Sequence, residues 1–358
     1  MNASRIVHHR LFWPVVALVA LILINTISRP TFLSITVKEG GLYGSLIDIL
    51  RNSSQLMLVA LGMTLVIATR GIDLSVGAVL AVAGAVSLTF IGGSSHPGDL
   101  GTVTIAVLLG LAVTLVLGAW NGFLVSVIKI QPIIATLLLM FAGRGIAMLI
   151  TKGQITTINS PPYAQFASGH LLGLPVAFLV ALAVTVLVAV VVRRSALGML
   201  MEAVGVNPEA SRLAGVQARG IIWIVYALSG LLAGMSGILY SSNIMAADAN
   251  NAGLNIELDA ILAVVIGGTS LAGGRFSIAG TVVGVLIIQT LTTSITFLGI
   301  PPAITPVFKA IVVIAICLTQ SQRVRAAIGS RHRRTRQTPT AGGLGTESPI
   351  EAEKAATA

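Results

Sequence analysis

The chain has 358 residues, of which 55% are hydrophobic and only 9% are charged, and its mean hydropathy is +0.95. Soluble globular domains carry about 25% charged residues, so this composition excludes the soluble class and indicates an integral membrane protein. The net charge of +10 invites a nucleic-acid interpretation, but the basic residues lie at the edges of apolar runs and in the tail. Membrane orientation produces that pattern, and we therefore expect no nucleic-acid partner.

Apolar runs along the chain predict about ten transmembrane helices. The first run, from Leu11 to Ile27, follows Arg5 and Arg10 and lacks the small-residue cleavage pattern of a signal peptide, so we expect a retained span. The expected fold class is an all-α integral membrane protein, in which 53–92 forms either two spans or one broken re-entrant unit. The predicted spans are 11–28, 53–69, 74–92, 102–128, 132–150, 174–192, 221–241, 258–274, 276–297 and 306–320.

The basic residues test the orientation of these spans. With the N-terminus inside, sixteen Lys and Arg residues fall in inside segments and five in outside segments. This excess agrees with the positive-inside rule, and it predicts cytoplasmic N and C termini and a cytoplasmic 193–220 segment. We expect 1–320 to form the transmembrane domain, and 321–358 to form a basic juxtamembrane segment and a disordered cytoplasmic tail.

Polar residues within the first apolar runs are functional candidates, because each is costly in hydrocarbon unless it faces a cavity or a partner. Asp73 follows Arg70 by three residues, so a local ion pair and a role in a transport path both remain open. Asn121 beside Trp120 is suited to a sugar, on whose apolar face the indole would stack, or to bridging two helices. Arg144 lies within a predicted span and needs a partner or water.

Glycine pairs spaced four residues apart occur within three of the predicted spans. Since glycine lets two backbones approach closely, these pairs indicate tight helix–helix packing. They are Gly118/Gly122, Gly230/Gly234 and Gly280/Gly284.

Residues 193–220, RRSALGMLMEAVGVNPEASRLAGVQARG, interrupt the apolar pattern with a polar segment. Asn207 is suited to N-cap a helix, Pro208 to its first position, and Glu209 to the positive end of its dipole. Gly215 supplies a left-handed stop. The pattern predicts a helix of about two turns, too short to span a bilayer and suited to docking another protein.

The second half of the chain carries polar residues on the predicted outer side, namely Asp248, Asn250, Asn251, Glu257 and Asp259. The glycine pairs 267–268 and 273–274 then interrupt the following span. In many transporters, interrupted helices direct free backbone groups toward a cavity, which would place this region at the transport path. The alternative interpretation is that the acidic residues form an ordinary outer loop. The candidate residues for a pathway or gate are Asp73, Ser75, Trp120, Asn121, Arg144, Asn250, Asn251, Asp259, Gly267 and Gly268.

Catalytic motifs are absent from the sequence. No Gly-Lys dipeptide occurs, so the chain has no phosphate-binding P-loop, and it has neither H-E-x-x-H nor G-x-S-x-G. Cys317 lies in an apolar run, as a packing residue does, and the five histidines lack metal-ligand spacing. We therefore expect a protein that is not an enzyme and that holds no cofactor or metal of its own.

Four ordered motifs resemble the permeases of bacterial ABC sugar importers of the ribose/xylose/arabinose type. They are TRGIDLSVGAVLAVAG, WNGFLVSVIKIQPIIATL, SALGMLMEAVGVNPEASRLAGV and LDAILAVVIGGTSLAGGRF, and the resemblance covers residues 11–320. The stretches GGLYGSLIDIL and DANNAGLNIELDAILAVVIGG are most similar to the galactofuranose-importer group. In one departure, Arg70 stands where the family often has a second glycine.

The resemblance implies a multi-pass protein of the bacterial inner membrane that moves a monosaccharide, galactofuranose or a pentose, into the cytoplasm. It also implies partners, namely a second identical or paralogous permease, an ATP-binding subunit that holds ATP and Mg²⁺, and a periplasmic or lipid-anchored sugar-binding protein. The alternatives are a permease for another small solute, such as a furanose signal, and an ion-coupled secondary transporter. The positions that match the family's cytoplasmic coupling helix are Glu202, Ala203, Gly205, Asn207, Pro208, Glu209, Ala210 and Gly215.

Overall fold

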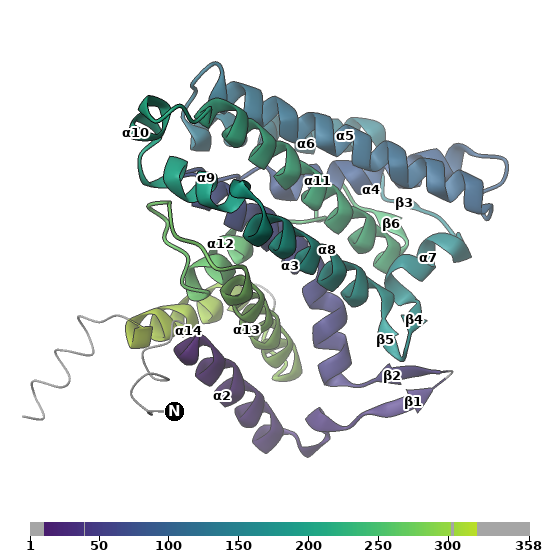
Figure 1. Ribbon diagram of the computed structural model, residues 1–358. Helices are drawn as coiled ribbons and strands as arrows, with labels where there is room; N and C mark the ends of the chain where they lie inside the picture. Colours follow the sequence, from purple (N-terminus) through teal and green to yellow (C-terminus); the bar gives the residue numbers. More distant parts are fainter. Residues whose placement is uncertain (1–10, 39, 302–303, 321–358) are drawn as a thin grey trace, which may run out of the picture. The chain divides into compact units, whose positions relative to one another are not determined.

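The computed structural model describes residues 11–38, 40–301 and 304–320, so the predicted tail at 321–358 and both predicted cytoplasmic termini lie outside the described residues. One compact unit ends at Ile316, and of the second unit, which begins at Cys317, only the end of one helix is described. Within the described residues, seven helices are long and apolar enough to cross a membrane (Figure 1). They are α3 (Ser45–Ala68), α4 (Val76–Gly93), α5 (Leu100–Ser126), α6 (Pro132–Ile150), α8 (Val176–Arg194), α11 (Ala218–Ile244) and α13 (Ile278–Phe297).

The helices at the other three predicted spans are shorter than these seven. Helices α2 (Phe12–Ser28) and α14 (Thr305–Gln320) have 17 and 16 residues. The prediction for 258–274 is wrong in extent, because helix α12 (Ile256–Ile266) has only 11 residues. It ends where Gly268 takes a φ of +85°, a left-handed conformation that suits glycine and terminates a helix. The expected interruption of this span is therefore present, and it ends the helix instead of only bending it.

Glycines bring α11 into close contact with its neighbours α5, α3 and α4. A Cβ atom added to Gly118 would lie 2.8 Å from the Gly230 Cα atom, so the α5 and α11 backbones touch at this point. Gly284 of α13 lies in the same way against Ala263 of α12, and Gly280 lies against Gly267. The glycine pairs thus mark helix contacts, as the sequence predicts.

Helices α3 and α4 are mostly buried and are joined by an irregular link at 69–75. Of the two alternatives for 53–92, the two spans agree with the structure, since both helices are long and apolar enough to cross a membrane. The link between them is buried at Asp73, which is 1% exposed. The start of α4 lies beside the middle of α6, because a Cβ added to Gly143 would be 3.2 Å from that of Ala78. The break between α3 and α4 is therefore part of the protein interior.

Short strands connect the segments that the charges place outside. Strand β1 (Thr36–Lys38) pairs with β2 (Gly41–Tyr43), and β4 (His170–Leu171) pairs with β5 (Leu174–Pro175) beside the short helix α7 (Pro161–Ser168), while η1 (Pro30–Leu33) follows α2. Strand β3 (Thr156–Thr157) pairs with β6 (Ala246–Ala247) and so joins the α6–α8 connection to the α11–α12 connection. Both connections are outside in the charge-based topology, and their pairing agrees with it.

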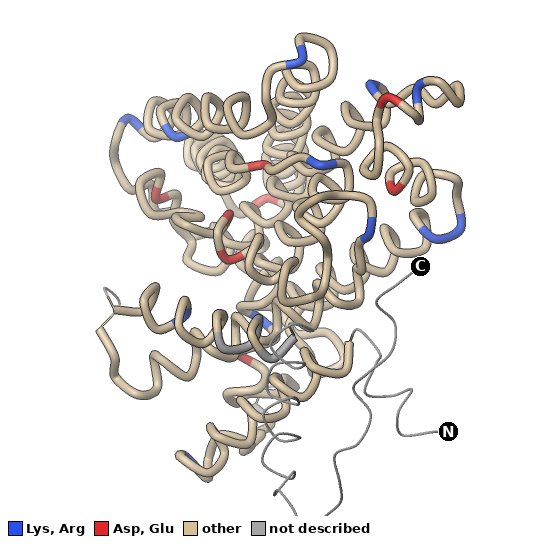
Figure 2. Tube along the Cα trace, turned by 90° about the vertical axis from the view of Figure 1, so that its left-hand side faces the viewer, with Lys and Arg blue, Asp and Glu red and all other residues tan. Residues whose placement is uncertain are grey.

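The segments predicted inside also meet one another. The Arg70 guanidinium donates to the carbonyls of Val206, at 2.6 Å, and of Ala272, at 3.0 Å. The Gly274 N–H donates to the Ala68 carbonyl at 3.0 Å. Three segments on the predicted inner side, far apart in sequence, are thus joined. Figure 2 shows that only a few positions along the chain carry a charged residue.

Candidate functional site

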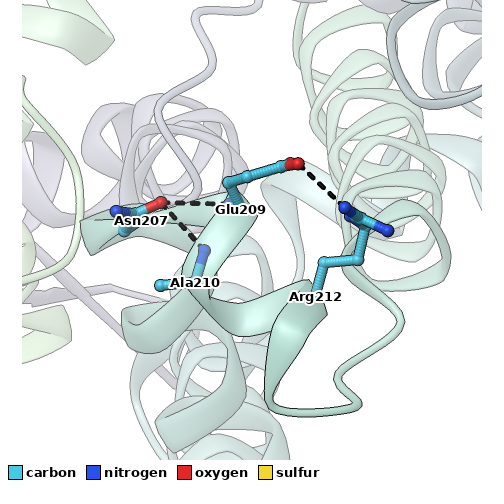
Figure 3. A network of polar contacts seen from close by, with 4 residues as sticks. All are labelled: Asn207, Glu209, Ala210 and Arg212. Carbon is cyan, nitrogen blue, oxygen red and sulfur yellow. Dashed lines mark hydrogen bonds and ion pairs between the residues drawn. The ribbon is translucent and has the colours of Figure 1, made fainter.

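Helix α10 (Pro208–Leu213) is the short capped helix that the sequence predicts between spans (Figure 3). Asn207 Oδ1 accepts hydrogen bonds from the N–H groups of Glu209 and Ala210, each at 3.0 Å. Gly215 follows with a φ of +83°, the expected left-handed stop. The predicted cap, proline position and stop are all confirmed.

The outer surface of α10 combines charge with an exposed leucine. Arg212 Nη2 lies 3.0 Å from Glu209 Oε1, and both side chains are well exposed. The hydrogen bond from Arg212, with its positive charge, lowers the pKa of Glu209, so this carboxylate is ionised at neutral pH. Leu213 is 79% exposed. An apolar side chain beside fixed charges is a common arrangement at protein–protein interfaces.

A second helix, α9 (Ala196–Val206), precedes α10 and was not predicted from the sequence. Ser195 caps it by accepting a hydrogen bond from the Leu197 N–H at 3.3 Å. Its Gly205 is buried against Ala68 and Gly274, whereas Glu202 and Ala203 are exposed. Of the eight positions that match the coupling helix, Gly205 alone is buried. Its close contact with Ala68 and Gly274 holds the segment against the end of α3 and the α12–α13 link.

A groove of about 750 Å³ lies beside α10. Its walls come from α10, from the α5–α6 link and from the start of α11, and they carry the basic residues Lys129, Arg212 and Arg219. The groove therefore offers a partner a basic rim next to the Glu209 carboxylate.

Asp73 lies in the link between α3 and α4 and belongs to a buried polar cluster. Its Oδ1 accepts hydrogen bonds from the Ser75 N–H, at 3.1 Å, and hydroxyl, at 2.6 Å, and its Oδ2 accepts from the Ser229 hydroxyl at 2.9 Å. Asn121 Nδ2 donates to Ser75 Oγ at 2.9 Å. Arg70 is bound to the carbonyls of other segments, so the local Arg70–Asp73 ion pair does not form. Ser229 was not predicted, because it lies 156 residues from Asp73.

The neighbouring residues Trp120 and Asn121 face different surroundings and do not form one joint sugar-binding or helix-bridging pair. Asn121 is 0% exposed and faces Ser75, whereas Trp120 is 52% exposed with its ring centroid 5.9 Å from that of Phe123. Asn121 bridges α5 to the α3–α4 link, and the indole lies on the outer surface of α5.

Arg144 is half-buried on α6 and holds the connection that follows α11. Its Nη1 donates to the carbonyls of Ala249, at 3.0 Å, and Ala252, at 2.6 Å. The guanidinium also interacts electrostatically with the carboxylates of Glu257 and Asp248. Glu257 was placed in the outer acidic cluster but not among the candidate pathway residues, and its proximity to Arg144 appears only in the fold.

The remaining candidates are distributed over the α11–α12–α13 region. Asn250 and Asn251 donate backbone N–H groups to Asp248 Oδ1, and the Asn251 side chain donates to Oδ2 at 2.7 Å. Asp259 of α12 forms an ion pair with Lys309 of α14 at 2.7 Å. Gly267 packs against Gly280, while Gly268 is exposed. These residues do not converge on one cavity.

Within the described residues, no group of three His, Cys, Asp or Glu side chains is arranged to hold a metal ion. Asp73 lies in the α3–α4 link, whereas Glu257 interacts electrostatically with both Arg144 and Asp259 on the α11–α12 side.

The chain is similar to known transport proteins over most of its length. The family described as branched-chain amino acid transport system / permease component matches residues 45–317. The galactofuranose transporter permease protein of Escherichia coli K12 is 49% identical over 88% of this chain and 92% of its own. The fructose import permease protein of Bifidobacterium longum is 42% identical over 90% of each chain, and the ribose import permease protein of E. coli K12 is 36% identical over 86% and 92%. No solved structure matches the chain.

Proposed function

Since the chain belongs to the branched-chain amino acid transport system / permease component family, we propose that it is the permease subunit of an ABC importer that carries a monosaccharide into the cytoplasm. Its relatives named for galactofuranose, fructose and ribose support a sugar rather than an amino acid as the solute. The observation that carries the proposal is the capped, exposed helix α10 between two membrane spans. The preferred candidate for the solute is galactofuranose, and a pentose or another furanose is the alternative.

The energy for transport comes from a separate subunit. The chain has no P-loop, so ATP and Mg²⁺ are bound by a partner ATPase. Helix α10 docks in that partner, with Leu213 as its apolar contact and Glu209 as its charged contact. Gly205 fixes the segment onto the α3 end and the α12–α13 link, so movement of α10 reaches the membrane helices. This is a coupling free energy between two remote sites.

The solute path runs past the Arg144 region between this permease and a second copy or paralogue. Arg144 lies about 9 Å along α6 from the outer end of that helix. Irregular backbone at 248–255 reaches this depth, and such backbone is tolerated only where protein or water surrounds it. Asn250 and Asn251 lie at the entrance, and the α12 break at Gly267 and Gly268 serves as a moving gate. A periplasmic or lipid-anchored binding protein supplies the sugar.

Uptake into proteoliposomes tests the proposed function. We expect the permease, reconstituted with its ATPase and binding protein, to import labelled galactofuranose only when ATP is available to the ATPase. Uptake should persist with an uncoupler, because no ion gradient drives it. Uptake that survives ATP depletion but stops with the uncoupler would instead identify an ion-coupled secondary transporter.

Replacing Arg144 by glutamine is expected to reduce sugar uptake about tenfold or more. The change removes the donors to the Ala249 and Ala252 carbonyls, and hydrogen bonds to charged groups contribute about 1.5–3 kcal/mol. The measurement is initial uptake rate against sugar concentration, with permease assembly checked by size-exclusion chromatography.

The matched control is Arg29→Gln, which removes an exposed bond to the Phe297 carbonyl outside the proposed path. It should leave the uptake rate nearly unchanged. Equal rates for wild type and Arg144→Gln would remove Arg144 from the path.

A further inference from the structure

The break between α3 and α4 contains a carboxylate with no basic partner. Asp73 is 1% exposed, and no Lys, Arg or His side chain in the described part of the chain forms an ion pair with it. The nearest basic residue in sequence, Arg70, is engaged by the carbonyls of Val206 and Ala272. A buried charge normally requires a partner of opposite sign.

Two further oxygen atoms around this carboxylate lack hydrogen-bond partners. Asn121 Oδ1 and the Tyr226 hydroxyl are buried and unpaired within the described residues, and both side chains are 0% exposed. Asn121 is attached to the cluster because its Nδ2 donates to Ser75 Oγ at 2.9 Å. The Tyr226 hydroxyl lies against Gly71 in the same link and interacts electrostatically with Asp73.

Helix capping explains only part of this arrangement. Ser75 donates to Asp73 Oδ1 at the start of α4, as at an ordinary helix N-terminus, and the Ser229 hydroxyl donates to Oδ2. These neutral donors and the positive end of the α4 dipole stabilise the carboxylate, but none of them supplies a full positive charge. They also leave Asn121 Oδ1, which can only accept, without a donor. A bound group that attracts carboxylate, amide and hydroxyl oxygens would give these unpaired oxygens a partner.

We propose that this break holds a monovalent metal cation, with Na⁺ as its natural occupant, bound by oxygens of Asp73, Asn121 and Tyr226. Hard cations prefer such oxygen ligands. A single carboxylate supplies one negative charge, which a monovalent ion neutralises, and no group of three acidic or other metal-binding side chains favours a divalent ion here. The cation stabilises the junction between α3, α4, α5 and α11.

The test is thermal unfolding of the purified full-length permease complex without ATP or sugar, so its result is separate from that of the uptake assay. We expect a higher unfolding midpoint in NaCl than in choline chloride of equal ionic strength, with a saturable dependence on Na⁺ concentration. Asp73→Asn should abolish this difference. Tyr226→Phe should require about tenfold more Na⁺ for half of the effect, and it tests the site if Asp73→Asn does not fold.

Asp99→Asn is the matched control. Asp99 also caps a helix, α5, by accepting hydrogen bonds from the Gly101 and Thr102 N–H groups, but it is exposed. This variant should keep the full response to Na⁺. Equal unfolding midpoints for wild type in NaCl and choline chloride would overturn the proposal, as would an undiminished Na⁺ response in both Asp73→Asn and Tyr226→Phe.

Discussion

Replacement of Leu213 by aspartate is expected to abolish co-purification of the permease with its ATPase subunit. Leu213 is 79% exposed at the end of α10, beside the Glu209–Arg212 ion pair. An apolar side chain that becomes buried at the centre of an interface contributes about 2–4 kcal/mol, and a carboxylate in its place adds a desolvation cost. The measurement is the amount of ATPase retained by affinity-tagged permease, together with the stimulation of ATP hydrolysis.

Leu172→Asp is the control for this substitution. Leu172 is 90% exposed in the turn between β4 and β5, on the side that the charges place outside. Its replacement makes the same change of an exposed leucine to aspartate as Leu213→Asp does, but away from α10, so binding of the ATPase should be retained. If Leu213→Asp co-purifies with the ATPase as well as Leu172→Asp does, α10 is not the docking helix.

Replacement of Gly230 by leucine is expected to prevent the permease from folding stably. A Cβ added at Gly230 would lie 2.6 Å from the Gly118 Cα atom and 2.8 Å from its nitrogen, so a side chain forces α5 and α11 apart. Overpacking a well-packed core costs about 1–3 kcal/mol, and because the neighbouring atoms here belong to the backbone, we expect a cost at or above the upper end. Fluorescence-detected size-exclusion chromatography after heating measures the loss.

Gly145→Leu provides the comparison. Gly145 also lies inside a transmembrane helix, α6, but no atom lies within 4 Å of an added Cβ. Because the substitution raises helix propensity and adds an apolar side chain to an exposed surface, the folded fraction should equal or exceed that of wild type. A Gly230→Leu variant as stable as Gly145→Leu would show that the α5–α11 contact is looser than the structure has it.

Signals that lie within a few consecutive residues were predictable from the sequence. The apolar runs identify all seven long helices, and Asn207, Pro208 and Gly215 identify both ends of α10. The end of α12 was less predictable, because its apolar residues continue to Ile266 and only the backbone at Gly267–Gly268 decides whether the helix continues. Helix α9 was missed because its sequence reads as part of a polar interruption.

By itself, the sequence determined that this protein is a multi-pass membrane protein and where the short capped helix α10 lies, and it predicted which way the spans run. These properties depend on hydrophobicity, charge and capping, which act between neighbouring residues. Only the tertiary structure decided that Asp73 meets Ser229 instead of Arg70, that Arg70 binds the α9 end, and that Glu257 lies near Arg144. The physical reason is that these partners are separated by more than a hundred residues, and only the packing of helices brings them within hydrogen-bonding or electrostatic range.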